Sequence, residues 1–173
     1  HTLFQSIYFF DPNGHRLELA ANTAAPGMLE QLDAVTTGPA TAVYSVLRKY
    51  GNVEYIATVV LSNGQRAVTL GNTKFLQSEP VVQTCKVDGS APCVNGIVAQ
   101  SASDVGLTVD FYAADTAKRL RRDADAKIGP AVASTSTVAD QQTTCVELPL
   151  PGGTAVYCVL DNGMLAKLDD GDV

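Results

Sequence analysis

Short apolar runs, separated by turn-forming residues, occupy most of this chain, and several of them alternate apolar with polar positions. Such alternation is typical of strands, because successive side chains of a strand point to opposite faces of a sheet. The clearest turn is Asn63-Gly64, which lies between two β-branched runs and predicts a hairpin. Strands are predicted within residues 6–20, as a hairpin, and at 53–61, 66–70, 73–77, 81–87, 94–99, 105–112, 144–148, 154–160 and 164–168. Residues 131–143 indicate a loop or a weak strand.

Three segments carry apolar residues at the spacing of a helical face. They cover residues 22–33, residues 42–50 before Gly51, and residues of about 115–128 before Gly129-Pro130. Asp115, or the residue before it, is the expected cap of the third helix. The apolar stripe of that helix consists of Ala117, Leu120, Ala124 and Ile128. Its charged positions are interpreted as a solvated face rather than a docking face: Lys118, Arg119, Arg121, Arg122, Asp123 and Asp125.

The strands are grouped rather than alternating with helices, which predicts an α+β fold with a mainly antiparallel sheet and two or three helices. Residues 34–41 are small and turn-prone, so they are the best candidate for a linker. They divide the chain into a β-rich domain at 42–173 and an N-terminal hairpin plus helix at 1–33, which is either an extra element of that domain or a foreign or truncated segment. His1 in place of Met indicates that a leader has been removed or that the chain is a fragment.

Composition narrows the classes of protein to which the chain could belong. Of its 173 residues, 46% are hydrophobic and 17% are charged, which excludes a disordered polar chain. The net charge of −6 argues against nucleic acid as a partner, because nucleic-acid sites need basic patches. The unbroken apolar runs are far shorter than the roughly 18 residues of a membrane-spanning helix, so we expect no transmembrane segment.

Four cysteines form two local pairs, Cys85 with Cys93 and Cys145 with Cys158. Each pair flanks turn-forming residues, and an even number in local pairs favours two short-loop disulfides. Free thiols and a metal site are the alternatives, although neither pair has the close spacing of a zinc knuckle. Disulfides would place the protein in an oxidising compartment, outside the cell or in its envelope.

One short stretch carries a motif, Tyr8-Phe9-Phe10-Asp11-Pro12-Asn13-Gly14 followed by Glu18. Residues 7–32 resemble the C-terminal strands of the vicinal oxygen chelate superfamily, which includes glyoxalases and extradiol dioxygenases. This resemblance implies that Glu18 is a ligand for a divalent metal such as iron or manganese. The other ligands in that family come from earlier strands, which this chain does not contain, so another chain would have to complete the site. Of the two histidines, His15 would point away from Glu18 within one strand and His1 lies at the end. The alternative is a glutamate on the solvent face of a hairpin.

Residues 42–173 are similar in texture to small exported envelope proteins of actinobacteria, some of which share the curved antiparallel sheet of lipoprotein carriers. The resemblance lies in the paired cysteines, the short strands and the ending Tyr157-Cys-Val-Leu-Asp-Asn-Gly163. It implies a curved sheet with helices over its concave side and an apolar or lipid-like ligand.

Three functions follow from these patterns. The first is an exported, envelope-associated and non-catalytic protein that binds an apolar or lipid-like molecule and needs no cofactor. The second is the metal-dependent enzyme completed by another chain, and the third is a structural or protein-interaction module. Five aromatic residues are interpreted as core, with the lining of a ligand cavity as the alternative: Tyr8, Phe9, Phe10, Phe111 and Tyr112. Four acidic residues near the end of the chain are interpreted as solvated: Asp161, Asp169, Asp170 and Asp172.

Overall fold

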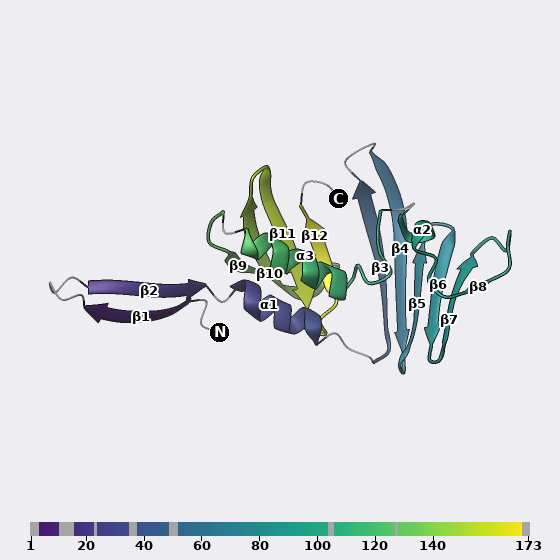
Figure 1. Cartoon of the computed structure of the whole chain (residues 1–173), viewed down its shortest axis with the longest axis horizontal. Coiled ribbons are helices and arrows are strands. Elements are labelled where there is room, and N and C mark those ends of the chain that lie inside the picture. The colour runs from purple at the N-terminus through teal and green to yellow at the C-terminus, as the bar shows by residue number, and fades with distance from the viewer. Residues whose placement is uncertain are drawn as a thin grey trace. The chain divides into compact units, whose positions relative to one another are not determined.

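The structure is a computed structural model of the whole chain (Figure 1). It describes residues 4–10, 16–22, 24–34, 38–48, 52–103, 106–126 and 128–170. For residues 4–10 and 16–22 the description covers the backbone.

The N-terminal hairpin predicted within residues 6–20 is confirmed. Its strands are β1 (Phe4–Phe10) and β2 (Arg16–Asn22). They pair antiparallel, and Tyr8 lies opposite Glu18. The turn between them lies outside the described residues.

The chain divides into two compact units. The first contains residues 1–35 and 116–171, and the second contains residues 36–115 together with 172–173. This division differs from the sequence-based one at 34–41, because α1 (Ala24–Asp33) shares a hydrophobic core with strands and a helix from the last third of the chain.

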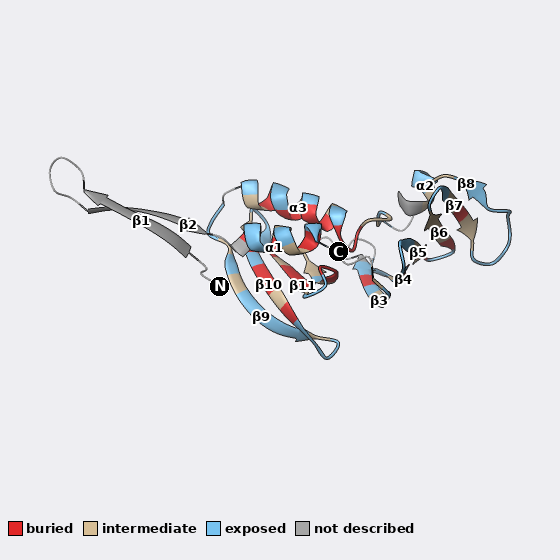
Figure 2. Cartoon of the chain, turned by 90° about the horizontal axis from the view of Figure 1, so that it is seen from below, coloured by how far each residue is buried: buried red, intermediate tan, exposed pale blue. Residues whose placement is uncertain are grey.

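In the first unit, two helices cover one face of a four-stranded antiparallel sheet (Figure 1, Figure 2). The strand order is β12-β11-β10-β9. The strands are β9 (Val132–Val138), β10 (Gln141–Leu150), β11 (Gly153–Leu160) and β12 (Leu165–Asp169). The meander predicted from 144 to 168 is therefore confirmed, and residues 131–143 supply a full strand and the start of β10.

The core of this unit forms where the two helices meet the sheet. Met28 and Leu32 of α1 and Leu120 of α3 (Ala114–Asp125) pack against Val146 and Tyr157 of the central strands. Full burial of a side chain of this size stabilises the fold by about 1.5–3 kcal/mol. The helical stripes predicted at 22–33 and 115–128 are confirmed apart from the last position. Ile128 is exposed, because α3 ends at Asp125 before the stripe can reach it.

The second unit contains a six-stranded antiparallel meander in the order β3-β4-β5-β6-β7-β8. The strands are β3 (Ala40–Arg48), β4 (Val53–Ser62), β5 (Gln65–Leu70), β6 (Thr73–Ser78), β7 (Val81–Lys86) and β8 (Val94–Asn95). The Asn63-Gly64 hairpin is confirmed. Ser62 pairs with Gln65, and both turn residues have positive φ, 45° and 79°, as a two-residue hairpin of type I′ requires.

The helix predicted at 42–50 is wrong, because Ala40–Arg48 forms strand β3. Val43, Val46 and Leu47 match helical spacing, but β3 pairs along its whole length with the β-branched strand β4. Exposure then alternates with the period of a strand: Val43 and Leu47 are exposed and Val46 is buried. The strand also begins inside the segment predicted as a linker.

Two further strand predictions are wrong or shortened. The strand predicted at 94–99 is limited to Val94–Asn95, and α2 (Ala99–Ser103) follows it. Residues 106–113 form turns rather than the strand predicted at 105–112. Their backbone groups bond locally: the N–H of Phe111 donates to the carbonyl of Thr108, and that of Ala113 to the carbonyl of Asp110.

Both predicted disulfides are present, Cys85–Cys93 in the second unit and Cys145–Cys158 in the first. Cys145 and Cys158 lie directly opposite each other on β10 and β11. The α+β class with antiparallel sheets is therefore confirmed, and the sheets are open. None of the helices in the described part of the chain has the length and apolar character needed to span a membrane.

Candidate functional site

An apolar stripe lies exposed on one face of β3 and β4. It consists of Val60, Val43, Ile56 and Leu47, in this order along the strands. Paired residues of adjacent strands lie on the same face of a sheet. Each of the pairs here contributes one large apolar side chain, which comes from β4 in one pair and from β3 in the next. Val60 lies opposite Thr41, Val43 opposite Thr58, Ile56 opposite Ser45, and Leu47 opposite Glu54.

The stripe is a contiguous surface rather than a set of scattered residues. Val43 and Ile56 lie on neighbouring strands in successive pairs of this face, so their side chains are neighbours. Their exposed fractions are nevertheless 66% and 55%. Single exposed apolar residues are ordinary on protein surfaces, whereas contiguous apolar patches mark interaction sites. Four successive pairs on one face extend over about 20 Å, given the rise of about 3.3 Å per residue.

One end of the stripe is polar. The hydroxyl of Ser45 donates a hydrogen bond of 2.6 Å to Oε1 of Glu54, and both residues are exposed. This pair lies beside Ile56 and Leu47 on the same face. The surface is therefore amphipathic along its length, with an acceptor carboxylate at one end and a valine at the other.

The opposite face of the same sheet is packed. Val46, Ala57 and Val59 are buried there, and the ring of Tyr44 meets that of Phe111 edge-on at 5.0 Å. Burial raises the pKa of Tyr44, and the neighbouring Tyr112 raises it further. Phe111 and Tyr112 are core residues, as the sequence predicted.

A polar cluster centres on Arg66 of β5, which also belongs to this inner face. Its Nε donates to Oε1 of Gln77 at 2.7 Å, and its Nη1 donates to Asp110 and, at 3.4 Å, to the hydroxyl of Tyr112. Desolvation lowers the pKa of Arg66, but the bonds to Asp110 and Tyr112 outweigh it, so the pKa is raised overall. The arginine is thus held as a cation that fixes the 106–113 turns to the sheet.

A small cavity of about 10 Å³ adjoins this cluster. Its lining includes Arg66, Phe75, Ile97 and Val109. A cavity of that size holds about one water molecule. This cavity is therefore too small to hold a lipid-like ligand.

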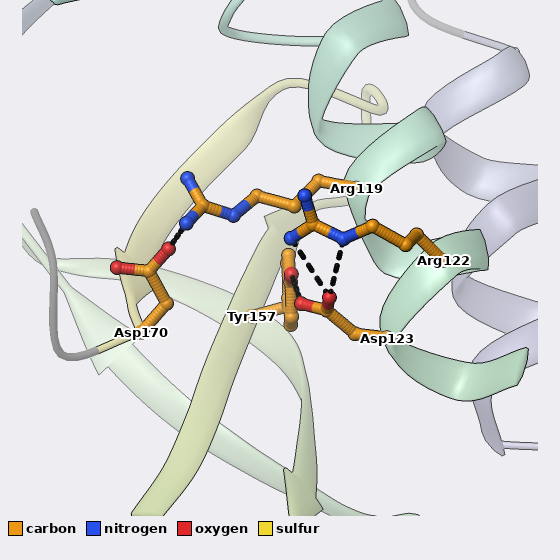
Figure 3. Close-up of polar contacts among 5 residues, drawn as sticks. All are labelled: Arg119, Arg122, Asp123, Tyr157 and Asp170. Carbon is orange, nitrogen blue, oxygen red and sulfur yellow. Dashed lines mark hydrogen bonds and ion pairs between the residues drawn. The ribbon is translucent and has the colours of Figure 1, made fainter. Parts of the chain in front are cut away.

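A second polar network lies in the first unit, between α3 and the sheet (Figure 3). Figure 3 shows Tyr157 and Arg122 converging on Asp123. The Tyr157 hydroxyl donates to Oδ2 of Asp123, and Arg122 donates from Nε and Nη2 to Oδ1 at 3.0 and 2.9 Å. Burial raises the pKa of Tyr157, and the bond to Asp123 raises it further. Both carboxylate oxygens of a buried aspartate are thus satisfied.

The solvated interpretation of Asp123 and Asp170 is wrong. The Asp123 side chain is only 5% exposed, and the buried Asp170 forms an ion pair with Arg119. A carboxylate this deeply buried needs hydrogen-bonded partners, and each aspartate has an arginine. Lys118 and Arg121 do lie on the exposed face, where Arg121 donates to Asp33 of α1 at 2.6 Å.

The structure does not describe the side chain predicted as a metal ligand, that of Glu18. Both histidines and the side chains of Tyr8, Phe9 and Phe10 also lie outside the described part of the chain. Among the described residues there is no group of three or more possible metal ligands. All four cysteines are held in disulfides. Metal ligation by Glu18 stays a prediction.

Comparison with protein-family models, with curated proteins and with solved structures found no match. Both resemblances drawn from the sequence therefore remain predictions.

The sequence pattern did not indicate the exposed stripe. A signal was present, because Val43, Ser45 and Leu47 alternate with Ala42, Tyr44 and Val46. Both sets contain apolar residues, so the alternation does not show which face is exposed. Only the pairing of β3 with β4 brings the exposed residues of the two strands together.

Proposed function

We propose that this is an exported, non-catalytic binding protein whose exposed stripe on β3 and β4 binds the extended apolar chain of a lipid-like molecule. The observation that carries the proposal is the contiguous run of Val60, Val43, Ile56 and Leu47 on a solvent-exposed sheet face. Covering these side chains removes apolar area from water, which favours binding by roughly 25 cal/mol per Å².

The shape of the stripe selects the ligand. A row about 20 Å long and one side chain wide fits an unbranched chain laid along it. The carboxylate of Glu54 and the hydroxyl of Ser45 at one end favour a polar end that donates hydrogen bonds, such as an alcohol, an amide or an amine. A carboxylate-ended chain would be repelled by Glu54.

The proposed location outside the cell or in its envelope is supported by the two disulfides, which persist in oxidising compartments. The proposal includes the curvature implied by the resemblance to lipoprotein carriers.

The proposal is tested with a long-chain alkyl amine that carries a fluorophore. We expect saturable binding to the wild-type chain and at least tenfold weaker binding to Ile56→Lys, because the ammonium would have to be covered by the alkyl chain. The matched control is Val132→Lys on β9, since Val132 is 56% exposed and Ile56 55%. Affinity should rise with chain length up to about 20 Å and then level off.

The polar end is tested separately. A fatty acid of the same length should bind more weakly than the amine, and Glu54→Gln should narrow that difference. Equal binding by Ile56→Lys and Val132→Lys would overturn the proposal. No binding of any probe would also overturn it and would favour the structural or protein-interaction module.

A further inference from the structure

Asparagine stands directly before glycine at four places in the chain: Asn13-Gly14, Asn63-Gly64, Asn95-Gly96 and Asn162-Gly163. The first of these pairs lies outside the described residues, and the other three lie at or just beyond the ends of strands. Asparagine before glycine is a reactive pair, because glycine has no side chain to shield its backbone nitrogen from the asparagine side chain. The three described pairs differ in how firmly their reacting groups are held.

The reaction of such a pair is the loss of the side-chain amide. The glycine nitrogen forms a bond to Cγ of the asparagine, and the bond from Cγ to Nδ2 breaks. The proton that the glycine N–H gives up is balanced by the one that the departing ammonia takes up. Water then opens the resulting succinimide ring at either carbonyl, which yields aspartate or isoaspartate. A hydrogen bond from the glycine N–H, or to the asparagine side chain, opposes ring closure, because that bond must first be broken.

Two of the described pairs are held by such bonds. The N–H of Gly96 donates to the carbonyl of Val82 at 2.7 Å. The N–H of Gly163 donates to the carbonyl of Leu160 at 2.9 Å. The side chain of Asn162 is held as well, because its Oδ1 accepts a hydrogen bond of 3.0 Å from the backbone N–H two residues further on. Both pairs are therefore protected in the folded chain.

The pair at the tip of the β4–β5 hairpin is not held in this way. Within the described part of the chain, the N–H of Gly64 donates no hydrogen bond and the side chain of Asn63 makes none. Both residues are exposed, and no atom lies within 4 Å of the position that a Cβ on Gly64 would take. The hydrogen-bonded ladder closes at Ser62 and Gln65, on either side of the pair. Water and the asparagine side chain both have access to the glycine nitrogen.

We infer that Asn63 is a site of covalent modification, at which the folded protein deamidates without an enzyme. Either product replaces a neutral amide by a carboxylate, so the net charge of −6 becomes more negative by one. Aspartate leaves the backbone unchanged, and Asp-Gly suits a type I′ turn as Asn-Gly does. Isoaspartate adds a carbon to the backbone between Ser62 and Gln65, which the two-residue turn cannot accommodate. The isoaspartate form therefore has a weakened hairpin.

The test is the rate of deamidation at each pair, measured by peptide mapping with mass spectrometry after incubation of the folded wild-type chain in mildly alkaline buffer. One hydrogen bond of ordinary net strength lowers the population of the free group about fivefold. We expect Asn63 to deamidate at least about fivefold faster than Asn95 and Asn162. Equal rates at the three sites, or a slower rate at Asn63, would overturn the inference.

The control for the role of the fold is the same chain, reduced and kept in concentrated urea. The three pairs should then react at similar rates, since each is an asparagine before a glycine in an unfolded chain. A preference for Asn63 as large in urea as in the folded chain would contradict the structural cause. The order of rates does not depend on the ligand proposed above.

The effect of the two products is tested by stability. Asn63→Asp supplies the aspartate product directly and should unfold at the same urea concentration as the wild type. The isoaspartate form, separated from the incubated wild-type chain by ion exchange, should unfold at a lower concentration. Coincident unfolding of the isoaspartate form and Asn63→Asp would contradict the expected loss of the two-residue turn.

Discussion

Asp123 is the buried residue on which the polar contacts of α3 converge. Its two oxygens accept hydrogen bonds from Tyr157 and Arg122. We expect Asp123→Ala to lower the free energy of unfolding by about 1–3 kcal/mol, because the Tyr157 hydroxyl is left buried without its acceptor. Urea denaturation measures the change. The control is Asp125→Ala on the exposed side of the same helix, which should stay within about 0.5 kcal/mol. Equal effects of the two substitutions would contradict the network.

The same contact predicts how stability depends on pH. Burial and Asp123 raise the pKa of Tyr157 above its ordinary value of 10.0. The unfolded chain therefore loses this proton before the folded chain does. The stabilisation is complete below pH 10 and falls as pH rises above it. Denaturation at a series of pH values from about 9 to 11 should show this decline, and Tyr157→Phe should make it shallower. A profile that Tyr157→Phe leaves unchanged would be inconsistent with the raised pKa.

Single residues differ in how far the sequence predicts them. The cysteine pairs were predictable, because both partners of each disulfide lie in one local stretch with turn residues between them. The burial of Asp123 was not, because it depends on Tyr157, which is 34 positions away along the chain. A carboxylate among Lys and Arg on a helix has the same local pattern whether it is solvated or buried.

Among the elements, hairpins with a strong turn were predictable, whereas β3 was not. The conformation of Asn63-Gly64 is determined by its own two residues, which adopt positive φ more readily than others. β3 carries both a helical and a strand spacing of apolar residues. Its pairing with β4 decides between them, and a pairing partner is not visible in a local pattern.

Gly64 should therefore tolerate substitution less well than a glycine in an ordinary conformation. Its φ is +79°, so Gly64→Ala should cost about 1–2 kcal/mol of stability through strain alone, since nothing lies within 4 Å of the added carbon. Thermal unfolding measures the loss. Gly152→Ala is the control, because that site is equally open and has no positive φ, and it should be nearly neutral. A neutral Gly64→Ala would argue against the type I′ turn.

At the scale of the whole molecule, each compact unit contains one disulfide. Cys145→Ala combined with Cys158→Ala should destabilise the first unit by about 2–4 kcal/mol, chiefly because its unfolded chain gains freedom. The backbone amides of β10 and β11 should then exchange hydrogen faster, whereas the exchange rates in β4 and β5 should change little. The control is Cys85→Ala with Cys93→Ala, which should raise the amide exchange rates of β7 instead. Identical exchange patterns for the two double variants would contradict this separation.

The α+β class was predictable from the grouping of strands, but the division into units was not. The core of the first unit joins α1 to residues more than 80 positions later, because their apolar faces are complementary in space. The stripe of the candidate site likewise depends on which segments of the chain come together in space. Its residues are apolar in sequence, but only the pairing of β3 with β4 shows that they are exposed together.

The central claim is that an apolar chain lies along the stripe, and methyl-detected NMR tests it most directly. A long-chain alkyl alcohol is titrated into protein labelled at the methyl groups of Val, Leu and Ile. The account predicts shifts for Val60, Val43, Ile56 and Leu47 and none for the buried Val146 and Val159 of the first unit. Shifts confined to Val146 and Val159, or no shifts at all, would contradict it.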